Sequence, residues 1–183
     1  PTGFAHEIDP HYETHCAHHA ALWLTPIEQR SARGVNSLLL DDDQRAEEKR
    51  ILAEHGLTVS SIGSPVGKIR ITEDFEPHLD WMRRALDVAA YFGAPYIRMF
   101  SFFIDEGDDP DRHRDEVLRR MKALVELEHG HDVTLLHENE KEIYGDIPRR
   151  CLDLVTTIDD PQFRLTWDPA NFVPVGVSAP FDE

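Results

Sequence analysis

Short apolar runs alternate with longer amphipathic segments along the chain, and this alternation constrains the fold more than any other feature of the sequence. The segments between the runs repeat apolar residues at steps of three and four, as Phe75, Leu79 and Met82 do, which predicts helices. Alternation of strands and helices predicts a parallel sheet built from βα units. The runs predicted as strands are residues 4–8, 26–30, 57–62, 96–102, 133–138 and 163–167.

Two α/β architectures fit this pattern, a doubly wound open sheet and a barrel. The sequence lacks a Gly-x-Gly-x-x-Gly motif after the first run, which argues against a dinucleotide-binding open sheet. Polar residues follow most of the predicted strands, as in a barrel that gathers its site at the C-terminal ends of its strands. We therefore expect one domain over residues 1–183, a TIM (β/α)8-type barrel with about six of eight βα units present and the C-terminal units missing.

A barrel has no open edges, whereas six strands alone leave two edges and an exposed apolar interior. The sequence is therefore expected either to be part of a longer barrel or to pair with a second copy as a homo-oligomer. In the first case the piece itself would be inactive or nearly so.

Composition narrows the class of partner. The net charge is −16 with histidines neutral, and the cations alternate with acids, so the clustered Lys and Arg that nucleic acid requires are not expected. No apolar run is long enough to cross a bilayer. Cys16 and Cys151 have no metal-binding or disulfide spacing, which indicates core positions and a reducing compartment. These features predict a cytoplasmic protein that binds a small molecule, with neither nucleic acid nor membrane as a partner.

Two acidic residues follow consecutive predicted strands. Glu138 ends the run 133–138, and Asp168 comes directly after the run 163–167 and before Pro169. Each has an ordinary explanation, an exposed loop acid for Glu138 and a turn opener for Asp168. However, neighbouring parallel strands lie about 5 Å apart, so the two carboxylates could bind one divalent cation. His137 is expected to face the opposite side of its strand.

Five segments in a shared order resemble the sugar phosphate isomerase and epimerase families of the xylose isomerase-like barrel superfamily, over essentially the whole chain. They are Ile27-Glu28-Gln29-Arg30, VSSIGSPVGKI at 59–69, YIRMFSF at 96–102, His137-Glu138-Asn139-Glu140 and WDPANF at 167–172.

The resemblance implies that Glu138 and Asp168 bind a divalent metal ion, with Glu138 also a catalytic proton-transfer group. Oxygen ligands favour Mg²⁺ or Mn²⁺, and imidazole ligands would admit Zn²⁺ or Co²⁺. Relatives complete the site with a His and a Glu from later strands, which this sequence does not contain. Many relatives also carry a His three residues after the sixth-strand Asp, where this chain has Asn171.

The substrate implied is a sugar or sugar-like hydroxy-carbonyl compound, isomerised or epimerised by carboxylate-mediated proton transfer with the metal polarising the carbonyl. Candidate substrate-binding residues are Lys68, Arg98 and Asn171. Lys68 could instead be a solvated residue of a tight turn, and Arg98 a barrel-interior residue. Two other functions stay open, a related metal-dependent apurinic-site endonuclease and a non-catalytic sugar-binding barrel.

Overall fold

The computed structural model describes residues 11–32 and 34–177. The chain forms two compact units, one of residues 1–64 and 84–97 and the other of residues 65–83 and 98–183. In chain order the elements are α1 (Tyr12–Ala21), β1 (Pro26–Gln29), β2 (Ser31–Ala32), β3 (Val35–Asn36), the 3₁₀ turn η2 (Ser37–Leu39), α2 (Asp42–Glu54), β4 (Thr58–Gly63), α3 (Glu76–Phe92), β5 (Tyr96–Met99), the 3₁₀ turn η3 (Pro110–His113), α4 (Arg114–Glu128), β6 (Thr134–Glu138), α5 (Pro148–Ile158), β7 (Phe163–Thr166) and α6 (Pro169–Phe172).

The main sheet has the strand order β1-β4-β5-β6-β7, which follows the order along the chain. The pairs β1–β4 and β6–β7 are parallel, and helices connect the strands, as βα units require. The prediction of a parallel barrel-type sheet is confirmed. The predicted strand at residues 4–8 lies outside the described residues.

The first unit contains the β1–β4 pair, α1 and α2. Buried Ile27, Val59 and Ile62 form part of its core. Helix α2 begins with a capping box, in which Asp41 accepts a hydrogen bond from the backbone of Gln44 and the Gln44 side chain bonds back. This reciprocal cap satisfies two backbone donors and fixes the start of α2 at Asp42.

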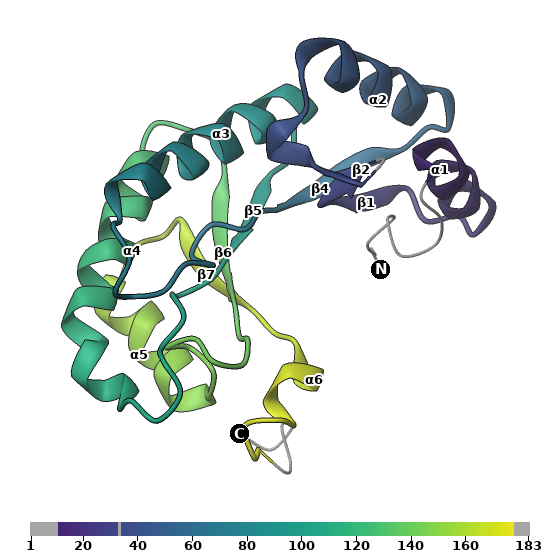
Figure 1. Ribbon diagram of the computed structural model, residues 1–183. Coiled ribbons are helices and arrows are strands. Elements are labelled where there is room, and N and C mark those ends of the chain that lie inside the picture. The colour runs from purple at the N-terminus through teal and green to yellow at the C-terminus, as the bar shows by residue number, and fades with distance from the viewer. Residues whose placement is uncertain (1–10, 33, 178–183) are drawn as a thin grey trace. The chain divides into compact units, whose positions relative to one another are not determined.

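The second unit contains the β6–β7 pair with α4 and α5 packed on one side of it (Figure 1). Burial alternates along β6, with Leu135 and His137 fully buried against the helices and Leu136 and Glu138 half-buried on the other face. A strand presents successive side chains to opposite faces, so His137 faces away from Glu138, as predicted. The half-buried face is the one that carries the candidate site.

One local prediction was wrong. The strand predicted over residues 96–102 ends at Met99. Phe102 has a φ of 68°, in the left-handed region, which ends regular extended geometry.

Both cysteines are free and buried, which confirms their core positions. Within residues 11–32 and 34–177, no helix combines the length and the apolar character needed to cross a membrane.

Candidate functional site

Glu138 is the last residue of β6 and pairs with an arginine from the neighbouring strand. Arg98 on β5 donates a hydrogen bond from Nη1 to Oε2 of Glu138 at 3.1 Å. Their side chains are only 10% and 14% exposed, so the two charges are largely removed from water and neutralise each other. The structure therefore brings together two of the predicted site residues, Arg98 and Glu138.

Asp168 follows β7, two residues beyond its last residue. Glu138 is paired with Thr166 in the parallel register, so their side chains point to the same face. Asp168 itself has extended backbone geometry and occupies the N-cap position of α6. One of its carboxylate oxygens, Oδ1, accepts a hydrogen bond from the backbone of Ala170 at 2.9 Å and caps α6. Asp168 therefore opens the turn into α6, as one of its two predicted roles required, and this role uses one of its carboxylate oxygens.

Asn139 connects the two strand ends, a role that the sequence did not reveal. Its amide donates to the Asp168 carbonyl at 2.7 Å and accepts from the Asp168 backbone N–H at 2.8 Å. The backbone carbonyl of Asn139 accepts a further hydrogen bond from the Asn171 side chain at 3.0 Å. Asn171 therefore braces the connection between the strands rather than standing free at the position where relatives carry a His. An asparagine directly after a predicted acidic ligand was the only available signal.

Lys68 lies on a tight turn, which was one of the two expectations for this residue. Its amine also contacts a carboxylate beyond the end of β6. The backbone N–H of Lys68 bonds to the carbonyl of Pro65 at 2.9 Å, and Gly67 between them has a φ of 87°, which matches a type II turn. The Lys68 amine donates to Glu140 Oε2 at 3.2 Å. Glu140 lies two residues beyond the end of β6, so Lys68 contacts the segment that follows this strand.

The ring of Phe100 lies beneath both cations of the site. The Lys68 amine is 4.2 Å from the ring centroid and the Arg98 guanidinium carbon is 4.8 Å from it. Cations within about 6 Å of an aromatic face are attracted by the ring quadrupole. The buried ring thus helps to keep Lys68 and Arg98 close to the carboxylates of Glu140 and Glu138.

His137 is not available to this face of the sheet. It is fully buried, its Nε2 lies 2.9 Å from the Ser101 hydroxyl, and that hydroxyl accepts a hydrogen bond from the Gly145 backbone. Burial lowers the pKa of His137 to about 3, so the ring is neutral. The contact between Nε2 and the Ser101 hydroxyl holds the ring in the buried interior, which makes His137 a structural residue.

The donor set on this face suits a hard, hydrated cation. Glu138 and Asp168 offer carboxylate oxygens, and Mg²⁺ is commonly held by one or two carboxylates while it keeps several waters. The described part of the chain places no group of three or more His, Cys, Asp or Glu residues in position to hold a metal ion. Carboxylate oxygens are ligands that hard divalent cations such as Mg²⁺ and Mn²⁺ accept, whereas Zn²⁺ sites usually include nitrogen or sulfur ligands.

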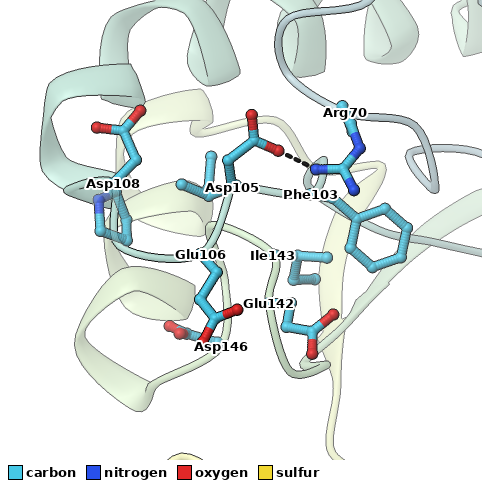
Figure 2. Close-up of a pocket in the computed structure, with 10 residues that line it drawn as sticks. Arg70, Phe103, Asp105, Glu106, Asp108, Glu142, Ile143 and Asp146 are labelled. Atoms are coloured by element: carbon cyan, nitrogen blue, oxygen red, sulfur yellow. Dashed lines mark hydrogen bonds and ion pairs between the residues drawn. The ribbon is translucent and has the colours of Figure 1, made fainter.

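An acidic hollow of about 640 Å³ lies beyond the ends of β5 and β6. Figure 2 shows Asp105 ion-paired with Arg70, and the carboxylates of Glu106, Glu142 and Asp146 around the rest of the lining. Loops at the C-terminal ends of the strands form this hollow, as they form the candidate site. The potential around this end of the sheet is therefore negative, which disfavours phosphate groups.

A second hollow of about 680 Å³ lies beside α5 and β7 and is mainly apolar. Leu152, Leu165 and Trp167 line it, and 59%, 40% and 49% of their surfaces are exposed. These side chains lie on the His137 side of the sheet and belong to a packing surface rather than to the candidate site.

The fold is that of a (β/α) barrel, of which this chain forms a part. The family model described as xylose isomerase-like TIM barrel matches residues 25–181. The chain belongs to this family.

Several solved structures are similar. A xylose isomerase-like TIM barrel protein from Mycobacterium smegmatis in complex with magnesium has a TM-score of 0.72 and 20% identity, over 88% of this chain and 57% of that one. The probable 3-DHS dehydratase AsbF from Bacillus anthracis has a TM-score of 0.78 and 17% identity, over 99% and 67%. D-psicose 3-epimerase with D-tagatose from Clostridium cellulolyticum H10 has a TM-score of 0.72 and 12% identity, over 94% and 64%.

These likenesses show the fold. The chain spans less than two thirds of the Mycobacterium smegmatis and Clostridium cellulolyticum structures. A search of curated proteins by sequence found no match.

Proposed function

We propose that the protein is a metal-dependent isomerase or epimerase. Its substrate would be a sugar or a related hydroxy-carbonyl compound. One observation carries the proposal: Glu138 ends β6 and Asp168 lies two residues beyond the end of the paired parallel strand β7, with the Asn139 side chain bonded to both the N–H and the carbonyl of Asp168. The similar epimerase structure supports the reaction class.

Glu138 and Asp168 would hold Mg²⁺ or Mn²⁺, and the magnesium in the similar Mycobacterium smegmatis structure supports this choice. When bound, the ion would supply Lewis-acid polarisation of a carbonyl oxygen. Glu138 is the candidate for moving the proton at the adjacent carbon. The guanidinium of Arg98 donates to the Glu138 carboxylate and fixes its orientation, as the positioning of a proton-transfer group requires.

Lys68 and Arg98 would contact the substrate. Because both cations are already in ion pairs, they limit the charge that a substrate can carry. Each cation already faces a carboxylate, Glu140 or Glu138, and the hollow beyond the strand ends is acidic. A phosphate would gain little attraction there, whereas hydroxyl groups can bond to both carboxylates and cations. We therefore propose an uncharged, hydroxyl-rich substrate.

The free, buried cysteines support a reducing cytoplasmic location. The exposed apolar lining beside α5 and β7 supports association with further barrel units or with a second copy.

Metal binding tests the proposal directly. We expect the chain to bind Mn²⁺, measured by electron paramagnetic resonance, and Glu138→Gln and Asp168→Asn each to weaken binding at least about tenfold, or about 1.4 kcal/mol. Glu142→Gln is the matched control, because Glu142 lines the acidic hollow on the same side of the strands. Equal loss in all three variants would mean diffuse attraction to acidic residues and would contradict the site. Deuterium exchange at the substrate α-carbon in the full-length, metal-loaded protein then tests proton transfer.

A further inference from the structure

The turn that carries Lys68 is held by a histidine that the proposed function does not use. His78 lies in the first turn of α3 and is 5% exposed. Its Nε2 accepts a hydrogen bond from the backbone N–H of Gly67 at 2.6 Å, in the buried interior of the second unit. The contact joins residues 11 positions apart, across the end of the turn and the start of the helix.

This hydrogen bond satisfies a donor that the turn itself leaves unpaired. A type II turn closes through the N–H of its fourth residue, which here is Lys68, and leaves the N–H of its third residue, Gly67, pointing away. Gly67 is buried, and a buried N–H without an acceptor is strongly unfavourable. The carbonyl on the other side of Gly67 accepts from the Phe102 backbone at 3.0 Å. His78 thus completes the set of bonds that fixes the turn.

The imidazole can accept this bond only when it is neutral with its proton on Nδ1. Burial, and then the positive charge of Arg120 on α4, lower the pKa of His78 to about 4, while Glu73 acts weakly in the opposite sense. The rings of Phe75 and Phe102 lie 6.5 Å and 6.3 Å from the imidazole. The surroundings therefore keep His78 in the form that accepts from Gly67 at neutral pH.

We propose that His78 is a positioning residue for the candidate site: through Gly67 it holds the turn that sets the Lys68 amine beside Glu140 and over the Phe100 ring. The position of the Lys68 amine can be tested without metal or substrate. Only the contact between Lys68 and a substrate rests on the proposed function. The chain from His78 to the site runs through three contacts, His78–Gly67, Gly67–Lys68 by covalent linkage, and Lys68–Glu140.

Two substitutions separate an accepting group from a space-filling one. His78→Gln keeps an acceptor, because the Gln Oε1 atom reaches about as far as Nε2 of histidine, whereas His78→Leu fills the space without one. In the 183-residue chain we expect His78→Leu to speed hydrogen exchange of the Gly67 amide about tenfold, the effect of one lost hydrogen bond. The β6 amides serve as the internal reference and should not change. We expect His78→Gln to stay close to the wild type.

The position of Lys68 is read separately by acetylation of its amine with acetic anhydride at neutral pH, followed by mass mapping. The rate should rise in His78→Leu and stay near the wild-type rate in His78→Gln. Loss of protection in both variants alike would overturn the proposal, because it would show that the acceptor is irrelevant.

A pH profile provides a third readout that a purely structural role would not move. The Gly67 amide resonance should titrate near pH 4 in the wild type, as His78 gains a proton and stops accepting, and this step should vanish in His78→Gln. A titration that persists in His78→Gln would assign it to other groups and contradict the proposal. If His78→Leu does not fold, this comparison alone decides. None of these measurements uses metal or substrate, so failure of the Mn²⁺ experiment leaves their result unaffected.

Discussion

At the scale of single residues, backbone conformation shapes the candidate site as much as side-chain chemistry does. Gly67 has a φ of 87° and its α-carbon faces the Phe100 carbonyl, so that a side-chain methyl would overlap this oxygen. Val66 and Gly67 also accept hydrogen bonds from the backbones of Phe100 and Phe102. The turn that carries Lys68 therefore lies against the backbone of the neighbouring segment, which only glycine permits at this point.

Gly67→Ala is expected to destabilise the fold by about 1–3 kcal/mol, the cost of holding a side chain in a strained conformation, with the overlap adding to it. Gly93→Ala is the matched control, because Gly93 has a φ of 70° but open space around it. Urea unfolding measures both free energies. An equal loss in the two variants would mean that positive φ alone matters and that the close approach to Phe100 does not.

At the scale of elements, α4 and α5 are tied by one carboxylate. Asp153 on α5 accepts two hydrogen bonds from Arg114 on α4, at 2.7 and 2.8 Å, and a third from the Tyr144 hydroxyl at 2.7 Å. The bonds from Arg114 lower the pKa of the Asp153 carboxyl to about 2. Because α5 packs on β7 and α4 packs on α5, this connection supports the strand that leads to Asp168.

Asp153→Asn is expected to lose about 1–2 kcal/mol at neutral pH, a moderate value because Arg114 is partly exposed. The pKa of Asp153 is lower in the folded state than in the unfolded chain, so its contribution is complete above about pH 4 and is lost as the pH falls toward 2. The stability difference between variant and wild type should therefore shrink over this window. Urea titrations at pH 7, 4 and 2.5 measure it; a difference independent of pH would contradict the ion pair.

At the scale of the whole molecule, the net charge of the chain argues against binding to DNA. The chain has a net charge of −16, and the loops beyond β5 and β6 add an acidic hollow next to the candidate site. A protein that binds duplex DNA exchanges phosphate counterions for clustered Lys and Arg. The described cations Lys68 and Arg98 at the site are instead already paired with carboxylates.

We accordingly expect no measurable binding of this chain to a duplex containing an abasic site, in fluorescence anisotropy at about 0.1 M salt. The undamaged duplex is the control. Binding that prefers the abasic duplex and weakens with salt would favour the endonuclease function instead.

Much of this architecture could be read from the sequence because it depends on local patterns. Hydrophobic periodicity predicted the strands of the main sheet to within a few positions, but not the short strands β2 and β3 or the short helix α6. The alternation in β6 placed Glu138 opposite to His137. Strand ends in a parallel sheet meet at one edge, so Glu138 and Asp168 could be nominated without coordinates.

The tertiary structure decided the contacts between segments distant in sequence. Asn139 bonding to Asp168, Arg98 to Glu138 and His78 to Gly67 all depend on how strands, turns and helices pack, which local periodicity does not encode. The same holds for Phe102, whose backbone is left-handed and whose N–H bonds to the Gly67 carbonyl. Sequence patterns specify which face a side chain takes, whereas packing chooses its partner.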